Sequence, residues 1–426
     1  MTLAKTVKGL GTHLGIAVLI WVLLAPSMSP VLVVIYSWGQ PDRNASIPVS
    51  IEQYTTITVN ATEIKERVSR AEEISPSLVG RTYPLRLTLN NMRSAGFKAM
   101  IERDNGSIEV TLPPPSTYKG DVVGRVTSRV ALTITDSWVA GYVSVEEAWI
   151  FIEPLRWYDP TADALTHFAY RTSDTDFALD DSGDALPIPK DSQGSSLVAS
   201  LSSGRGRVAP TSHVYSTVLY ADILPDGDPE FYDINPSDWS QRQTAVLNAV
   251  DTIFDGQIDI QFNIVAQHVW AAGGPLTSTR SSTLLRQFRD AWEPVTYPPW
   301  TPRDLAFLFT GKDLDGLTIG RAWLGGLGTS YHYSLAQQVP GGNYDASLYQ
   351  RIVLSAHEIG HTFNAIHDEA AYFCVFREGG RCLAYGYTIM KRPWQGSLMQ
   401  DEFSDGTQQL GKNNVERIRA KAEEEL

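Results

Sequence analysis

The strongest constraint on this chain is the segment 357–368, which reads HEIGHTFNAIHD. On an α-helix, residues four apart are separated by about 40° around the axis and about 6 Å along it. His357 and His361 therefore project from one face of a helix, where two imidazoles can bind a single metal ion. Glu358 lies one residue further round, where its carboxylate can reach a water on that ion without being a ligand.

The third candidate ligand is His367, six residues after His361. It can return to the same ion only if the helix ends and the chain turns sharply. Asn364 is the expected turning point, because asparagine is, after glycine, the residue that best tolerates a positive φ at a helix end. Three histidines leave one position open, which is typical of a catalytic Zn²⁺. The alternative is a chance HExxH sequence with ordinary surface or core histidines.

The pattern HExxHxxxxxHD with a later Ile-Met resembles the reprolysin/adamalysin (ADAM-like) family of metzincin zinc metalloproteases. The resemblance implies that Met390 forms the Met-turn, an apolar floor beneath the three imidazoles and not a ligand. It also implies that Asp368 orients the site by hydrogen bonds from behind the ligands. Met399 is a competing Met-turn candidate, but the spacing to the Phe-Ser-Asp sequence at 403–405 favours Met390.

Two further positions bear on this resemblance. Astacins and serralysins usually have a metal-binding tyrosine where Arg392 stands, which counts against those two families. The reprolysins normally have glycine where Asn364 stands, so we expect a slightly strained turn. The implied activity is peptide-bond hydrolysis with one catalytic Zn²⁺ and Glu358 as general base. Ca²⁺ is not indicated by any motif.

A second segment, 311–326, also resembles the reprolysins. An edge strand has unpaired N–H and C=O groups, so an extended polypeptide substrate can add to it as another strand. The alternative is an ordinary buried strand; Arg321 and the neighbouring glycines favour an edge. By the resemblance, the edge strand above the cleft consists of Ile319, Gly320, Arg321, Ala322, Trp323 and Leu324.

The predicted fold class is α+β or α/β. Apolar periodicity predicts strands over 214–223, 258–269 and 304–310, and helices after Pro236, over 283–292, over 348–363 and from 413 to the end. By the resemblance, residues 211–426 are a metzincin catalytic domain, a twisted mixed five-stranded sheet with a zinc-binding helix.

Residues 40–191 are predicted to form a mostly β domain. Strands are expected over 83–89, 107–112, 126–135, 141–145 and 148–152. Four fragments in this region, at 118–120, 128–132, 149–155 and 167–171, resemble the ADAM-type propeptide in order and spacing. The chain is therefore expected to be made as a latent zymogen.

Latency cannot use the cysteine thiolate with which such propeptides commonly bind the zinc. The two cysteines, Cys374 and Cys382, both follow the zinc motif, and we expect them to form a small disulfide loop; the alternative is a pair of free thiols. Asp191 stands roughly where the switch of the family would lie, and a carboxylate can bind zinc. The alternative is an ordinary acidic loop residue.

The N-terminal residues 1–39 begin with Lys5 and Lys8 and continue with apolar runs, which indicates an export signal. We expect an uncleaved hydrophobic helix that anchors the chain in the membrane with the catalytic domain outside. The alternative is a cleaved signal peptide and a secreted protein. Residues 192–210 read as an exposed linker, with maturation expected near Arg207 and an uncleaved linker as the alternative.

A formal charge of −13 over 426 residues argues against nucleic acid as a partner. The predicted function is a zinc endopeptidase that acts on extracellular or cell-surface proteins. The competing class is a catalytically silent metzincin-fold binding or adhesion module, against which the presence of Glu358 speaks. A hydrolase of small substrates is a third reading. The cleavage specificity and the oligomeric state cannot be derived from the sequence.

Overall fold

The computed structural model describes residues 46–145, 148–175, 178–179, 184–189, 217–293, 302–341, 344–368, 372–378, 381–387, 389–390, 394–395 and 413–426. The predicted N-terminal helix within 1–39, the linker 192–210 and Asp191 lie outside these residues. In the part of the chain that is described, no helix is both long and apolar enough to cross a membrane.

The first sheet is built only from residues before 172. Its seven strands lie in the order β1-β11-β10-β9-β8-β7-β4, and every neighbouring pair is antiparallel. The strands are β1 (Thr55–Thr58), β4 (Leu85–Leu89), β7 (Thr117–Val122), β8 (Arg129–Ile134), β9 (Val139–Val145), β10 (Ala148–Pro154) and β11 (Thr166–Arg171).

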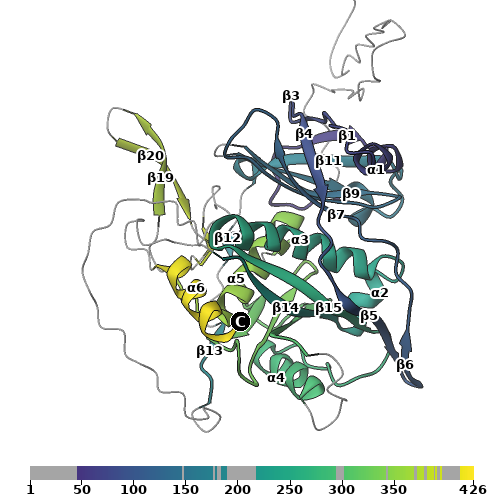
Figure 1. The fold of residues 1–426 in the computed structure, drawn as a ribbon, viewed down its shortest axis with the longest axis vertical. Helices are drawn as coiled ribbons and strands as arrows, with labels where there is room; N and C mark the ends of the chain where they lie inside the picture. The colour runs from purple at the N-terminus through teal and green to yellow at the C-terminus, as the bar shows by residue number, and fades with distance from the viewer. Residues whose placement is uncertain are drawn as a thin grey trace, which may run out of the picture.

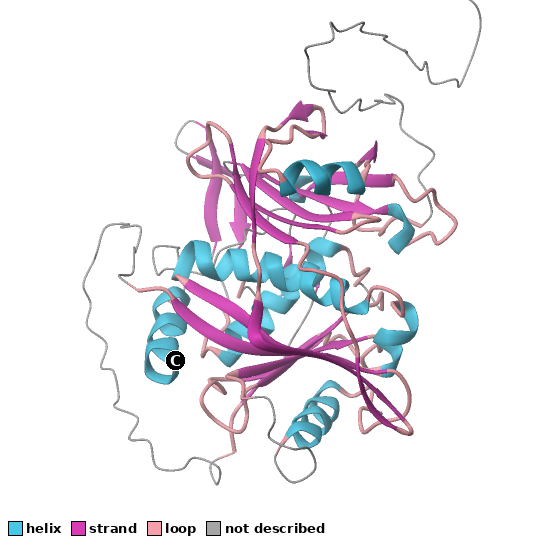
Figure 2. Ribbon diagram, turned by 45° about the vertical axis from the view of Figure 1, so that its right-hand side comes forward, coloured by secondary structure: helices cyan, strands magenta, loops and turns pink. Residues whose placement is uncertain are grey.

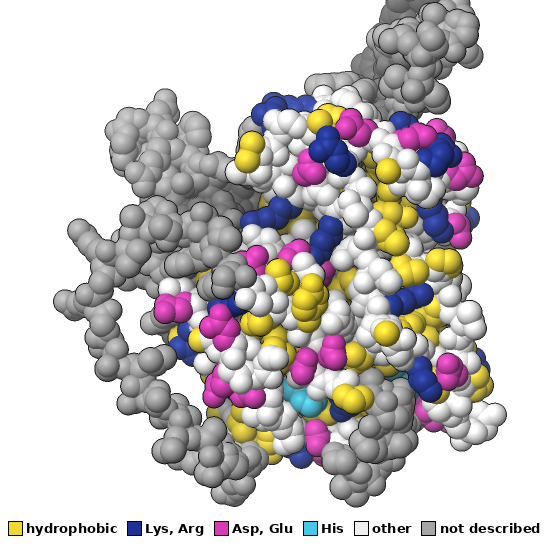
Figure 3. Space-filling view, viewed as in Figure 1, with side chains coloured by type: hydrophobic (Ala, Val, Ile, Leu, Met, Phe, Trp, Pro, Cys, Tyr) yellow, Lys and Arg dark blue, Asp and Glu magenta, His cyan; other side chains and the backbone are white. Residues whose placement is uncertain are grey.

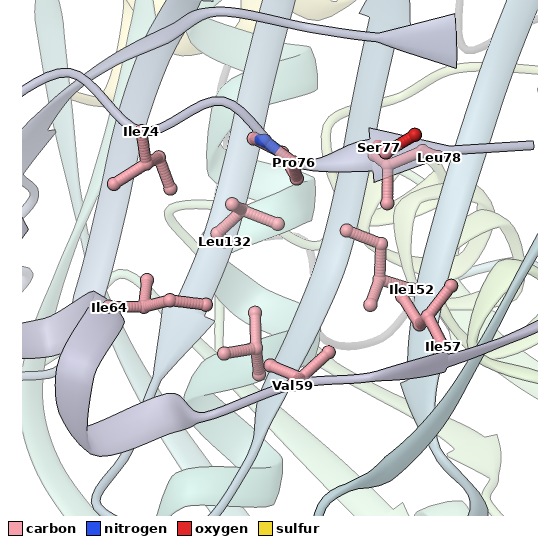
Figure 4. Close-up of a pocket in the computed structure, with 10 residues that line it drawn as sticks. Ile57, Val59, Ile64, Ile74, Pro76, Ser77, Leu78, Leu132 and Ile152 are labelled. Carbon is pink, nitrogen blue, oxygen red and sulfur yellow. The ribbon is translucent and has the colours of Figure 1, made fainter. Parts of the chain in front are cut away.

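One face of this sheet is covered by helix α1 (Ala61–Ser69), whose Ala61, Ile64 and Val68 pack into an apolar cluster with Leu132. Short elements complete this half: β2 (Ser77–Leu78), β3 (Arg81–Thr82), and the 3₁₀ turns η1 (Leu155–Trp157) and η2 (Thr172–Asp174). The pocket in Figure 4 lies in this cluster and is lined almost wholly by apolar side chains, among them Ile57 and Ile152. Ser77 is the one lining residue with a polar side chain, and no titratable side chain lies beside it in the lining.

The second sheet has eight strands in the order β13-β17-β18-β16-β14-β15-β5-β6. Its five central strands are parallel except for β17, which is the mixed five-stranded arrangement that the resemblance implied. These five are β14 (Leu219–Gly227), β15 (Ile260–Trp270), β16 (Leu305–Thr310), β17 (Gly320–Trp323) and β18 (Tyr333–Gln337). Figure 2 shows the strong twist of this sheet.

The three outer strands of the second sheet come from the N-terminal half of the chain. β5 (Arg93–Arg103) and β6 (Gly106–Glu109) extend one edge, and β13 (Ala185–Leu186) lies on the other. The strand predicted over 107–112 overlaps β6 at residues 107–109, and β6 pairs with β5 in the second sheet. Figure 1 shows β13 and the β5–β6 hairpin at opposite sides of the molecule.

Helices α3 (Trp239–Ile258) and α5 (Leu348–Thr362) lie between the two sheets, and α4 (Ser281–Trp292) covers the far face of the second sheet (Figure 2). Since α3 packs against strands of both sheets, the N-terminal and C-terminal halves of the chain share one hydrophobic core. The remaining elements are α2 (Pro229–Ile234), α6 (Asn414–Glu425), the hairpin β19 (Tyr372–Glu378) and β20 (Arg381–Tyr387), and the pair β12 (Ala178–Leu179) and β21 (Trp394–Gln395).

On one face of the molecule, positive and negative side chains are mixed. On the face shown in Figure 3, the Lys and Arg side chains of the described residues are scattered among Asp and Glu and do not gather over one element. The candidate functional residues His357, Glu358 and His361 are buried.

Candidate metal centre

Helix α5 supplies two of the metal-binding candidates. Ser347 caps its N-terminus, since its side chain accepts a hydrogen bond from the backbone N–H of Gln350 at 3.4 Å. The helix is buried along its whole length except for Arg351, because it lies between the two sheets. His357 and His361 stand four residues apart on one face, with ring centroids 4.7 Å apart.

The turn after α5 brings the third histidine back. Asn364 has φ +72°, the left-handed conformation expected of it, and its N–H donates to the carbonyl of His361 at 2.8 Å. Arg417 of α6 holds this turn from outside, since its Nε donates to the Asn364 carbonyl at 2.9 Å. As a result Nε2 of His367 lies 3.1 Å from Nε2 of His361 and 3.2 Å from Nε2 of His357.

Backbone carbonyls fix the orientation of two of these rings. Nδ1 of His357 donates to the carbonyl of Ile389 at 2.7 Å, and Nδ1 of His361 donates to the carbonyl of Ala365 at 2.8 Å. A carbonyl can only accept, so Nδ1 carries the hydrogen and Nε2 presents its lone pair. Burial lowers the pKa of His361 and lowers that of His367 to about 4, which keeps both rings neutral.

Met390 and Asp368 lie behind the ligands. The N–H of Asp368 donates to the carbonyl of Met390 at 2.8 Å, and the Asp368 carboxylate accepts from Asn414 Nδ2 at 3.1 Å. Both side chains are fully buried. Since Ile389 bonds His357, the 389–390 turn is tied directly to the metal-binding candidates; Met399 lies outside the described residues.

Asp184 is the site residue that the sequence analysis missed. Its Oδ2 lies 3.0 Å from Nε2 of His357, and its Oδ1 lies 3.0 Å from Nε2 of His367 and 3.6 Å from Nε2 of His361. The side chain is fully buried.

These four residues form the one group of potential metal ligands found in the described part of the chain. Their ligand atoms all lie within 4.8 Å of one another. Donor atoms at the corners of a tetrahedral zinc site are about 3.3 Å apart, given zinc–nitrogen distances of about 2.0–2.1 Å. The measured separations fit that geometry, so the residues present can hold a zinc ion.

Glu358 lies beside this group without belonging to it. It is fully buried, and its side chain packs against the backbone of Gly320 in β17. A Cβ added at Gly320 would lie 2.8 Å from both Cγ and Cδ of Glu358 and closer still to Oε1. Glycine at 320 therefore makes the room in which this carboxylate lies.

The predicted substrate strand is β17, which begins one residue after Ile319 and ends one residue before Leu324. β18 pairs with one side of it, antiparallel. β13 pairs with the other side, parallel, with Ala185 opposite Ala322 and Leu186 opposite Trp323. Arg321 points to α4, where its Nε donates to Ser281 Oγ at 2.8 Å.

The remaining predictions are not tested. Asp191 lies outside the described residues. The hairpin β19–β20 carries Cys374 opposite Tyr385 and Cys382 opposite Arg377, but its side chains lie outside what the structure describes, so the disulfide stays a prediction. The four propeptide-like fragments lie on β7, β8, β10 and β11, four of the seven strands of the first sheet.

Comparisons with known proteins agree with this geometry. Residues 221–404 match the reprolysin sequence model described as Metallo-peptidase family M12. The hemorrhagic metalloproteinase-disintegrin-like kaouthiagin of Naja kaouthia is 27% identical over 135 residues, which is 32% of this chain and 32% of that protein. Snake venom metalloproteinase TM-1 of Protobothrops mucrosquamatus is 26% identical over 155 residues, 36% of this chain and 73% of that protein.

The matched segment thus spans about a third of kaouthiagin, and 22% of the zinc metalloproteinase-disintegrin-like atrase-B of Naja atra. A solved structure described as a chaperone-substrate complex covers 49% of this chain at 15% identity and a TM-score of 0.36, a likeness too low to support an argument.

Proposed function

From the membership of this chain in the reprolysin/adamalysin family of M12 metallopeptidases, we propose that it is a zinc-dependent endopeptidase made as a latent zymogen. The observation that carries the proposal is the convergence of three imidazole Nε2 atoms, with two of the rings oriented by backbone carbonyls, beside the buried carboxylate of Glu358. His357, His361 and His367 would hold the zinc.

When bound, zinc lowers the pKa of a coordinated water towards 7 and polarises the scissile carbonyl. The residues of the chain supply the rest. Glu358 accepts the proton of the attacking water and transfers it to the leaving amine. Its carboxylate is positioned by the packing against Gly320, which places the base at the rim of the substrate strand. Asp368 and the 389–390 turn keep the rings in place.

The substrate we propose is an extended polypeptide that adds to β17 on the side that β13 occupies in the uncut chain. This proposal is supported by the backbone hydrogen bonds that β17 already makes on this side. The N–H of Ala322 donates to the Asp184 carbonyl at 3.2 Å, and that of Leu324 donates to the Leu186 carbonyl at 2.9 Å. Recognition through the backbone favours polypeptides over small molecules, because the hydrogen-bonding groups of a strand edge repeat at every second residue and an extended chain can pair with several of them.

We further propose that the protein is exported and acts on extracellular or cell-surface proteins, either secreted or anchored through residues 1–39. The apolar N-terminal segment and the cysteine pair support this. The seven-stranded sheet would be the inhibitory prodomain, with 192–210 as the segment where it is cut.

The competing proposal is a silent binding module with the same fold. The buried Glu358 next to the three histidines argues against it, because a binding module has no use for a base at that position.

The test uses the full chain, cut within 192–210 by a protease that cleaves after arginine. We expect the cut chain to hydrolyse quenched-fluorescent peptides, with loss of activity in a zinc chelator and recovery on addition of zinc. Glu358→Gln keeps the size of the side chain and should lower kcat about 10²- to 10⁴-fold at unchanged zinc content. Cut, zinc-loaded protein that hydrolyses no peptide of an extended library would overturn the proposal in favour of the binding module.

A further inference from the structure

The carboxylate of Asp184 faces the lone pairs of two of the imidazoles around it. The rings of His357 and His361 give their Nδ1 hydrogens to carbonyls and turn Nε2 lone pairs towards the carboxylate oxygens. Acceptor atoms would then face one another at 3.0–3.6 Å in a fully buried site. Lone pairs that face one another in this way repel, and a cation between them would turn the repulsion into coordination.

We propose that Asp184 is the fourth ligand of the zinc ion in the uncut chain, and that residues 184–189 thereby keep the enzyme latent. The inference rests on the proposed function of the same site. Three neutral imidazoles and one carboxylate are a donor set that suits Zn²⁺. The carboxylate occupies the position that the catalytic water needs, so Glu358 has no water to activate.

The segment is held on the substrate strand by its backbone. The carbonyls of Asp184 and Leu186 accept from the N–H groups of Ala322 and Leu324, which are the groups a substrate would use. Leu186 and Ile188 pack, partly buried, against the apolar cluster that contains Trp323. One segment therefore blocks both the metal position and the edge to which a polypeptide adds.

The same geometry explains why the segment is not cut. The carbonyl oxygen of Asp184 is engaged by Ala322, and the group that faces the imidazoles is the side chain. Oδ1 of Asp184 also accepts from the N–H of Ala185 at 2.7 Å, which fixes the carboxylate in this orientation. The peptide bond after Asp184 is therefore turned towards β17 and away from the ion, where it is not polarised for attack.

The test needs a readout other than turnover, and cobalt supplies it. The full, uncut chain is loaded with Co²⁺ in place of zinc, and its visible spectrum is recorded with and without acetohydroxamic acid, which binds an open metal position. We expect the wild-type spectrum to be unchanged by acetohydroxamic acid. Asp184→Ala opens the fourth position, so its spectrum should change. Asp191→Ala is the matched control and should behave as wild type.

Peptide hydrolysis by the same uncut zinc proteins gives the second measurement. Asp184→Ala should raise it at least tenfold over wild type, and Asp191→Ala should not. Asp184→Asn keeps the shape and the hydrogen bond to Ala185 but weakens the ligand, so it carries the test if the alanine variant does not fold by circular dichroism.

The outcomes separate the two proposals. A wild-type spectrum that responds to acetohydroxamic acid as strongly as the Asp184 variants, or a response confined to Asp191→Ala, would overturn the Asp184 switch. Asp184 variants that bind acetohydroxamic acid but hydrolyse no peptide, even after they are cut within 192–210, would support the switch and refute the endopeptidase.

Discussion

The N-terminal half of the chain contributes strands to both edges of the second sheet, and the two edges differ in length and in surroundings. At the far edge, six of the eleven residues of β5 pair with β15, and β6 pairs with the other side of β5 at residues 100–103. At the near edge, the two residues of β13 pair with β17 beside the three histidines. β13 is parallel to β17, and β5 is parallel to β15.

The two edges therefore have different roles: β5 attaches the N-terminal half of the chain to the C-terminal half, and β13 covers the candidate metal centre. A backbone hydrogen bond contributes only about 0.5–1.5 kcal/mol net, so a two-residue strand is held weakly by its ladder and depends on the ligand at its start. The eleven-residue strand, together with Met92 and Ala99 in the main core, holds the halves together without touching the site. The near edge can therefore be released while the far edge stays paired.

Removal of the metal should release the near edge, where β13 pairs with β17, and leave β5 paired with β15 at the far edge. We expect this to be the largest of the predicted effects. Without a cation, the buried Asp184 carboxylate faces the Nε2 lone pairs of His357 and His361, and removing one partner of a buried charge costs about 3–5 kcal/mol. Residues 184–189 should then detach, and the amides of Ala322 and Leu324, which bond that segment, should exchange with deuterium about 10³-fold faster.

The far edge supplies the internal control for that measurement. The amide of Ile264 donates to Met92 and that of Ala271 to Glu102, and neither is near the site. Hydrogen exchange followed by mass spectrometry, with and without chelator, should show no change at these two amides. Equal acceleration at both edges would mean that the metal stabilises the whole sheet, and the distinction drawn above would fail.

Gly320 in β17 and Gly96 in β5 differ in how much room they leave for a side chain. Gly320→Ala in β17 puts a methyl group into the carboxylate of Glu358, whereas Gly96→Ala in β5 meets nothing within 4 Å. A displaced catalytic base costs about 10²-fold in rate, so Gly320→Ala should lower the kcat of the cut enzyme by about that factor. Zinc content should stay the same in both variants.

Gly96→Ala should keep the parental rate, because neither its backbone nor its surroundings change. Equal kcat values for the two variants would show that the contact between Gly320 and Glu358 does not position the base.

Attachment at the far edge is tested by the cut chain, whose halves should remain together in size-exclusion chromatography. Ala99 is buried against the main core, so Ala99→Asp introduces a buried charge that should weaken their association by about 1–3 kcal/mol, or about 5- to 150-fold. Arg103→Asp, at the exposed end of the same strand, is the control and should not separate the halves. Co-elution of the Ala99 variant at nanomolar concentration would show that β5 contributes little to attachment.

Local sequence signals were sufficient for the residues on α5 and the turn after it. The spacing of His357 and His361 follows from the helical period, and the left-handed turn at Asn364 follows from the preference of asparagine for that conformation. The strand β17 was also visible in its own residues. What the sequence did not supply was the role of Arg417, fifty-three residues away, in holding that turn.

Asp184 could not be chosen from the sequence because its role depends on contacts more than 170 residues away. The stretch 174–191 contains six aspartates, and nothing local separates the one that meets the histidines. The far-edge strand had a readable signal: Ala95, Phe97, Ala99 and Ile101 alternate with other residues, which predicts a strand. The alternation does not show which sheet the strand joins. β5 holds the two halves of the chain together because it joins the second sheet.

The smallest expected effect lies at the contact between the first sheet and the zinc-binding helix. Glu153 of β10 is fully buried, and it accepts hydrogen bonds from the N–H of Leu348 in α5 at 3.0 Å and from the hydroxyls of Tyr170 and Tyr158. Burial raises the pKa of Glu153, although these hydrogen bonds oppose the rise. The folded chain therefore takes up a proton more readily than the unfolded chain does.

The sign of the pH dependence follows from this. The contribution of Glu153 to stability is complete below the pKa of an unfolded glutamate and is lost as the pH rises through the raised pKa. Glu153→Gln does not titrate, so its melting temperature relative to wild type should rise with pH across the mildly acidic range. The exposed Glu52→Gln is the control and should show no such trend. A constant difference between Glu153→Gln and wild type at every pH would mean that the contact with α5 does not perturb this carboxylate, and that attachment depends on the far edge and on apolar packing alone.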